Sequence, residues 1–217
     1  LLSYHHKLLP ENIELMHILA DCYVLTQNLN KATHLNREIF IISPETQHQA
    51  CLKRALRVLD LQPNHSKTSL LHIDILIFNK QFEVVFSMIS SLLDQSSSLA
   101  NQLEKRLQEI HQLHPEIHPK LQLLFVKCYY LQEKYSTCLN LCELILEQSP
   151  CSETRSYQVL AHLKSSQLKK AQEIYSVLLT DTPLSSKVLL SKQLMLSSLA
   201  KPYESKDFSI QTGISFY

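Results

Sequence analysis

The chain has 217 residues, 45% of them hydrophobic and 19% charged, with a formal net charge of +1 and one glycine, Gly213. This composition is typical of a folded protein with a sizeable core and excludes a disordered chain. Phosphate-binding loops, Rossmann turns and tight β-hairpins need glycine, so most nucleotide-loop enzymes and all-β folds are excluded, and the balanced charge gives no field that attracts nucleic acid. The sequence therefore predicts an all-α protein.

The first two predicted helices lie around Met16 and around Ala32, and the second is followed by a proline stop. That second helix carries a bulky residue, a smaller residue three positions later and a stop twelve positions after that. The same trio recurs along the chain as Leu29, Ala32 and Pro44; Phe82, Val85 and Ser97; Tyr135, Cys138 and Pro150; and Leu168, Ala171 and Pro183. A recurring motif of this kind predicts stacked helical hairpins, with the small residue where two helices cross.

The first three trios are 53 residues apart, and the surplus over a plain hairpin is enough for one further helix each time. Residues 43–65 begin with Ser-Pro-Glu, a helix-start signal, and reach a stop at Pro63. Residues 96–118 begin with serines and reach a stop at Pro115. The sequence therefore predicts two inserted helices, followed by two plain hairpins. An odd helix reverses the direction of the next one, so the inner and outer faces of the array can swap.

The hairpins resemble the tetratricopeptide repeat (TPR), a unit of about 34 residues with the pattern W-x2-L-G-x2-Y, then A-x3-F, then P. The first hairpin matches best, through Met16, Leu19, Ala20, Tyr23, Ala32, Ile39 and Pro44. Where the family favours glycine, this chain has Ala20, Ile73, Val126 and Val159, which makes the units degenerate. The resemblance implies a right-handed α-α superhelix, a TPR-like solenoid of about ten or eleven helices. An irregular helical bundle with chance spacing is the alternative.

We expect the solenoid to occupy residues 1–201, with a capping helix over residues 184–200. The remaining residues, 202–217, contain Pro202, Gly213 and alternating apolar positions. This pattern predicts an extended or disordered tail, a segment that lies back along the solenoid, or the start of a further domain.

No catalytic set, phosphate loop or cofactor motif stands out, so we expect a non-enzymatic protein without a cofactor. Six cysteines without a CxxC pair predict reduced thiols and a cytoplasmic location, and no apolar run is long enough to span a membrane. The nearest metal candidates are the histidines His111, His114 and His118 and the cysteines Cys128, Cys138 and Cys142. We interpret them as a helix end and as core, and expect no metal. The basic runs around Arg54 and Arg106 are interpreted as solvated faces.

The TPR resemblance also implies that the first helix of each hairpin lines a concave groove. The residues carried over to this partner-binding groove are His17, Asp21, Val24, Lys67, Leu70, Asp74, Lys120, Lys127, Tyr130 and Glu153. Chaperone-binding TPR proteins clamp a terminal carboxylate with a lysine and an asparagine, but here those positions hold His17 and Asp21, which would repel it. For the apolar positions, the alternative is simple interhelical core. We expect reversal of the charge at Asp21 or Lys127 to leave the fold intact and to weaken binding of the partner.

These features predict a scaffold or adaptor that binds a peptide or a partner helix of another protein. Two alternatives stay open: a secretion or assembly chaperone, and the recognition arm of a larger enzyme. Because the chain begins at Leu1 rather than at a methionine, the recognition arm of a larger enzyme and membership of a larger complex both stay among the expectations.

Overall fold

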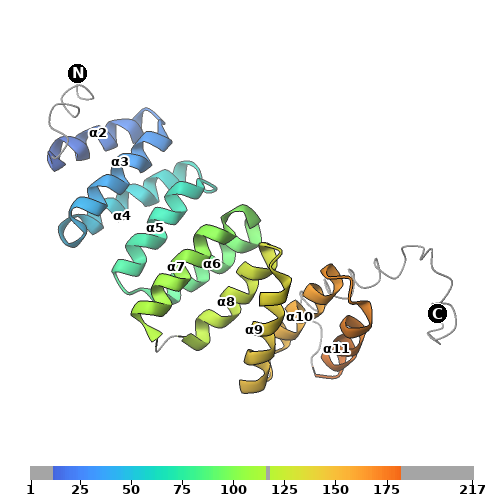
Figure 1. Ribbon diagram of the computed structural model, residues 1–217. Helices are drawn as coiled ribbons and strands as arrows, with labels where there is room; N and C mark the ends of the chain where they lie inside the picture. The colour runs from blue at the N-terminus through green and yellow to red at the C-terminus, as the bar shows by residue number, and fades with distance from the viewer. Residues whose placement is uncertain (1–11, 116–117, 182–217) are drawn as a thin grey trace. The chain divides into compact units, whose positions relative to one another are not determined.

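The computed structural model describes residues 12–115 and 118–181, with side chains for all of these except 118–120 and 179–181. The predicted capping helix over residues 184–200 and the predicted tail over residues 202–217 lie outside the described residues. By its internal contacts the chain divides into two compact units, one up to Leu124 and one from Phe125 on. Each is described by itself below, with the helix labels of Figure 1. The single domain over residues 1–201 stays a prediction.

The described residues contain ten α-helices, one short 3₁₀ helix and no strand, which confirms the all-α prediction (Figure 1). The first compact unit contains α2 (Ile13–Leu25), α3 (Leu29–Ile42), α4 (Pro44–Leu61), α5 (Ser66–Phe78), α6 (Phe82–Gln95), η1 (Ser97–Leu99) and α7 (Ala100–Leu113). Helix α8 (His118–Leu131) crosses the boundary, and the second unit continues with α9 (Tyr135–Gln148), α10 (Ser152–Lys164) and α11 (Leu168–Asp181).

The hairpin register predicted from the sequence is confirmed. The second helices of the four hairpins, α3, α6, α9 and α11, begin at the four bulky residues of the trios: Leu29, Phe82, Tyr135 and Leu168. The small residues three positions later are all fully buried: Ala32, Val85, Cys138 and Ala171. The residues at the glycine positions of the TPR pattern are equally buried: Ala20, Ile73, Val126 and Val159. The recurring small residues therefore mark the helix crossings.

The same turn closes each of the four hairpins, although the turns contain no glycine. Gln27, Lys80, Glu133 and Ser166 have φ angles of 55° to 60°, in the left-handed region. In the first turn, the N–H of Asn28 donates to the carbonyl of Tyr23 at 2.8 Å and the N–H of Gln27 to that of Val24 at 3.0 Å. This pair of backbone hydrogen bonds is the Schellman motif, in which the last carbonyls of the helix find donors. It directs the chain into the antiparallel partner helix.

Both inserted helices are present, as α4 and α7. Pro44 lies in the first turn of α4, where its missing N–H costs nothing. Within the first compact unit, α2 packs on α4, α3 packs on α5, and α5 packs on α7, in addition to contacts between successive helices. Alternate helices therefore form layers, with α2 and α4 in one layer and α3, α5 and α7 in the other. Helices α2 to α4 and helices α5 to α7 form two three-helix repeats.

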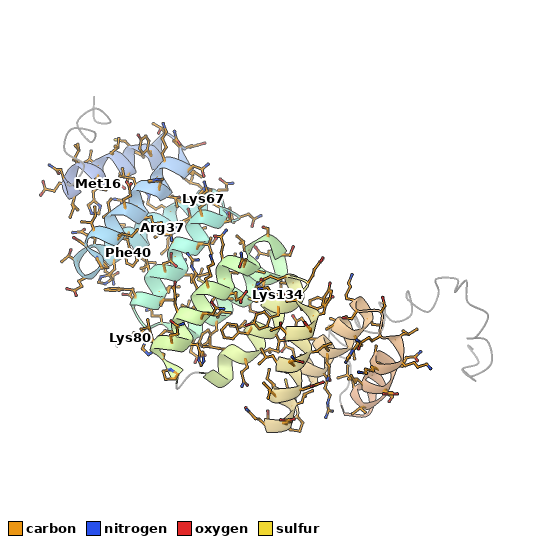
Figure 2. All side chains as sticks on the ribbon, in the orientation of Figure 1. Met16, Arg37, Phe40, Lys67, Lys80 and Lys134 are labelled. Carbon is orange, nitrogen blue, oxygen red and sulfur yellow. The ribbon has the colours of Figure 1, made fainter. Side chains whose placement is uncertain are left out.

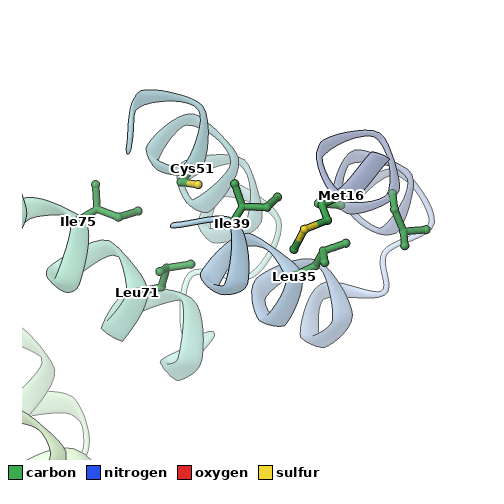
Figure 3. Packing of buried hydrophobic residues seen from close by; sticks show 8 residues of the cluster. Met16, Leu35, Ile39, Cys51, Leu71 and Ile75 are labelled. Atoms are coloured by element: carbon green, nitrogen blue, oxygen red, sulfur yellow. The ribbon is translucent and has the colours of Figure 1, made fainter. Parts of the chain in front are cut away.

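A hydrophobic core cluster of the first unit lies between these layers. Figure 3 shows part of it: Met16 of α2 lies beside Leu35 of α3, and Ile39 of α3 lies between this pair and Leu71 and Ile75 of α5. Cys51 of α4 closes the cluster, and Ala20 gives the backbone of α2 room to approach α3. In the second unit, a smaller cluster joins α10 and α11 through Val159, Ala171, Tyr175 and Leu178.

A larger side chain at a helix crossing should destabilise the fold. We expect Ala32→Leu and Ala171→Leu each to lower the free energy of unfolding by about 1–3 kcal/mol, because neither crossing has room for the added atoms. Urea unfolding curves measure the effect, and the matched control is Ala50→Leu on the exposed side of α4. Equal stability of all three variants and the wild type would show that the crossing register is wrong.

Candidate functional site

Two residues expected in the groove, His17 and Asp21, instead face an arginine of the inserted helix α4. Arg54 is only 5% exposed, and its Nε donates to Asp21 Oδ1 at 2.8 Å. Its Nη1 donates to Asn36 Oδ1 at 2.8 Å, and its Nη2 lies 3.0 Å from His17 Nδ1. Arginine can only donate, so Nδ1 of His17 accepts and the proton lies on Nε2, which donates to Gln47 Oε1 at 2.8 Å. The network joins α2, α3 and α4.

The ion pair changes the titration of the carboxylate. The hydrogen bond from Arg54 holds the pKa of Asp21 below its ordinary value of 3.8, although partial burial opposes the shift. The positive charges of Arg54 and Arg57 lower this pKa further. Asp21 is therefore a carboxylate at neutral pH and a fixed partner of Arg54.

A second network occupies the equivalent place in the next three-helix repeat. Asp74 of α5 follows Asp21 by 53 residues, and Arg106 of α7 follows Arg54 by 52. Arg106 donates from Nε to Asp74 Oδ1 at 2.5 Å and from Nη2 to Asp74 Oδ2 at 2.9 Å. Arg37 of α3 reaches the same Oδ2 through Nη2 at 3.2 Å. One carboxylate thus lies between two guanidinium groups.

The expectation that the basic runs form solvated faces is wrong for their two arginines at the repeat positions. Arg54 and Arg106 are 5% and 11% exposed, because each turns toward the carboxylate of the first helix of its repeat. Lys53, Arg57 and Lys105 in the same runs are exposed, as expected. A run of basic residues therefore combines solvated side chains with one that holds two helices together.

The contacts of Asp21 and Lys127 argue against the expectation that reversal of either charge leaves the fold intact. Asp21 anchors Arg54, and Lys127 is only 4% exposed inside the second unit. Reversal at Asp21 would take the partner away from the buried Arg54 guanidinium, and reversal at Lys127 would place a negative charge at a buried position. Val24 and Leu70 are also buried, as in the alternative that assigns the apolar positions to interhelical core.

The remaining predicted groove residues have different surroundings. The ring of Tyr130 lies 6.0 Å from that of Tyr135 and 5.7 Å from that of Tyr157, measured between centroids. Burial of the phenol raises the pKa of Tyr130. Glu153 is half-buried in the first turn of α10. Lys67 is exposed at the start of α5, and the side chain of Lys120 lies outside the described residues.

The inserted helix explains why the carried-over residues of the first unit do not share one face. In a plain TPR array the first helices of successive hairpins are neighbours in one layer. Here α4 intervenes, so α5 lies in the layer of α3 while α2 lies in the layer of α4. His17 and Asp21 therefore belong to one layer, and Lys67 and Asp74 to the other.

A groove of about 850 Å³ is lined by α2, α3, α5 and α7, with most of its lining residues on α3. It is lined by Leu19 and Tyr23 of α2, by Asn30, Lys31, Thr33, His34, Leu35, Arg37, Glu38 and Ile41 of α3, by Lys67 and Leu70 of α5, and by Gln102 of α7. Leu19, Leu35 and Leu70 are buried and form its floor. Lys31, Arg37 and Lys67 are exposed and stand at its rim; Figure 2 labels the last two on the neighbouring helices α3 and α5.

The residues of α3 are the part of the groove that the sequence analysis did not identify. Asn30, His34, Arg37 and Ile41 follow one another at helical spacing on one exposed stripe. The signal was present in Ile41, an apolar side chain on this polar stripe that is 68% exposed. It was missed because the TPR pattern assigns binding to the first helix of a hairpin.

A smaller concavity of about 310 Å³ lies where the C-terminal ends of α2 and α4 meet. The two exposed leucines there, Leu25 and Leu61, border Arg57 and Asp60. Within residues 12–115 and 118–181, no three His, Cys, Asp or Glu side chains are placed to hold a metal ion. In the same part of the chain, no helix combines the length and the apolar character needed to cross a bilayer.

Comparison with known proteins finds a likeness only among solved structures, and several chains match there. No protein-family model matches the sequence, and no curated protein matches it. Among solved structures, the chain is similar to the crystal structure of the TPR domain of P58(IPK), with a TM-score of 0.45 and 13% sequence identity. The likeness covers 92% of this chain and 60% of that one. The TPR-like hairpin fold described above is established by the helix bounds and turns of the chain itself.

The lowered pKa of Asp21 predicts a pH-dependent contribution to stability. This stability is fully present above the ordinary pKa near 3.8 and is lost as the pH falls through the lowered pKa of the folded state. We expect Asp21→Asn to lower the free energy of unfolding by about 1 kcal/mol or less at neutral pH, since the carboxylate is half exposed. At a pH below the pKa of Asp21 in both the folded and the unfolded state, we expect no loss. Urea curves over a pH series measure this, with Asp60→Asn on α4 as the control. A cost that does not change with pH would contradict the assignment.

Loss of the arginine should be more harmful than loss of the aspartate. Arg54→Met leaves the buried Asn36 oxygen without its donor, which predicts a loss of about 1–3 kcal/mol in the free energy of unfolding. Arg57→Met, three residues away and exposed, is the matched control. If thermal and urea unfolding treated both methionine variants alike, Arg54 would have no role in joining the helices.

Proposed function

We propose that this chain is a non-enzymatic interaction scaffold that binds a segment of another protein in the groove formed by α2, α3, α5 and α7. The observation that carries the proposal is the groove itself, with buried leucines below and charged side chains at its edge. An apolar centre with a polar rim is the usual composition of a protein-binding surface. Its volume is in the range of ligand-binding clefts.

The dimensions of the groove favour a short segment. Helix α3 has 14 residues and is therefore about 21 Å long. An extended peptide of about six residues, or a helix of about fourteen, covers the same length. Isolated exposed apolar side chains are common on protein surfaces, but Ile41 shares the groove lining with the buried leucines that form its floor. A partner that covers Ile41 removes this side chain from water.

Several finer points belong to the proposal. Of the carried-over groove residues, Lys67 and Leu70 line this groove and are retained as contacts. His17 and Asp21 contact Arg54 instead, and Asp74 contacts Arg106. A cytoplasmic location is supported by the absence of a CxxC pair among the six cysteines, a pattern that fits reduced thiols in a reducing compartment. The chaperone and the enzyme-arm alternatives stay predictions, and the proposal does not depend on them.

Site-specific photo-crosslinking in the native cell tests the proposal. A photoreactive amino acid at Ile41 should capture one recurrent partner protein, whereas the same amino acid at Leu56, an exposed position on α4, should not. The Ile41 position is suitable because its side chain is exposed and the fold does not depend on it. Capture from Leu56 alone, or no specific capture from either position, would contradict a scaffold that binds through this groove.

A further inference from the structure

The charges around the groove narrow the chemistry of its occupant. Lys31, Arg37 and Lys67 line it with one carboxylate, Glu38, in a chain whose net charge is only +1. Glu38 lies 3.5 Å from His34 Nδ1, its neighbour one helical turn away. The three cations come from two helices, α3 and α5, so they do not form the solvated face of one helix. The lining of the groove therefore carries more cations than carboxylates.

The Asp74 network sustains this excess. Asp74 is shared by two guanidinium groups, and Arg106 binds it through both Nε and Nη2. Arg37 reaches it only at 3.2 Å, and the side chain of Arg37 is 49% exposed. One negative charge therefore compensates one of two positive charges. Arg37 is held in place at the rim and still presents donor groups to an incoming carboxylate.

The floor adds a second requirement. Leu19, Leu35 and Leu70 are buried beneath the rim, and Tyr23 and Ile41 border them. The leucines themselves are nearly out of water, so an apolar partner releases water mainly from Ile41, which is 68% exposed, and from the half-buried Tyr23. A polyanion without apolar groups would pair with the cations at the rim but would not cover the apolar side chains of the groove. The occupant therefore needs acidic side chains and apolar side chains on one short segment.

We infer that the groove accepts an acidic, amphipathic segment of a partner protein. Its apolar side chains lie on the leucine floor, and its carboxylates meet Lys31, Arg37 and Lys67. The inference rests on the proposed function and adds the chemical class of the ligand. Charge complementarity at a rim speeds association and selects partners more than it adds affinity, so the apolar contacts supply most of the binding free energy.

A peptide-display selection on the full chain tests the inference without knowledge of the natural partner. Random peptides long enough to fill the groove are selected, and the consensus is synthesised as a fluorescent probe for anisotropy. We expect the consensus to be rich in Asp and Glu with apolar residues between them. Replacement of its acidic residues by their amides should weaken binding on the order of tenfold at low salt. Added salt should also weaken binding of the unmodified consensus peptide.

Matched variants locate the binding. Lys31→Glu combined with Lys67→Glu should lower the affinity for the peptide probe on the order of tenfold. Lys53→Glu combined with Lys169→Glu changes the net charge equally at exposed positions outside the groove and should leave affinity unchanged. Ile41→Ser should also weaken the probe, through loss of apolar contact. All these side chains are exposed, so thermal unfolding should show folded variants throughout.

Several results would overturn the inference. These are a neutral or basic consensus, equal affinity for the Lys31→Glu/Lys67→Glu variant, failure to select any peptide, or binding of a fluorescent oligo-dT with the same affinity and the same variant sensitivity. The last result would indicate recognition of polyanions in general. Crosslinking from Ile41 remains a separate readout, so the scaffold proposal can stand when the acidic-segment inference fails.

Discussion

In each three-helix repeat, an arginine of the third helix pairs with an aspartate of the first helix, and this contact constrains how the inserted helix packs in the first compact unit. Arg54 meets Asp21, and 52 and 53 residues later Arg106 meets Asp74. Helices α4 and α7 are insertions relative to a plain array of hairpins, and they need a partner other than the hairpin itself. A buried ion pair contributes little net stability against an apolar replacement, but it fixes which surfaces meet. It sets the packing of the inserted helix on the helix two positions before it.

That packing determines where a ligand can bind. With three helices in each repeat, alternate helices share a layer, so α3 and α5 become neighbours and the second helix of one hairpin faces the first helix of the next. The groove forms on this mixed layer. Leu19, Leu35 and Leu70 form its floor because the hairpin crossings already bury them, while Lys31, Arg37 and Lys67 remain in water at its rim. The extra helix thus moves the exposed stripe of α3 into the position that the first helices occupy in a plain array.

Much of the fold could be predicted from the sequence, because local signals determine it. Leu29, Phe82, Tyr135 and Leu168 begin the second helices, and the small residues after them mark the crossings. The inserted helices were also predicted, from their start and stop residues. The site was harder to predict from the sequence. Periodicity places a side chain on a face of its helix, but it does not say which other helix covers that face. Arg54 and Lys127 resemble solvated residues in the sequence and are buried in the structure. Only the pairing of α3 with α5 brings Arg37 and Lys67 to one groove.

Hydrogen–deuterium exchange of the full chain, alone and in complex with the partner captured at Ile41, tests the central claim most directly. The account predicts that the partner slows exchange along α3 and at the start of α5, while α4, in the other layer, exchanges as in the free protein. Protection confined to α4, or to helices of the second compact unit, would contradict a binding site on the layer of α3 and α5. The hairpin fold would stand in that case, and the groove would lose its assigned role.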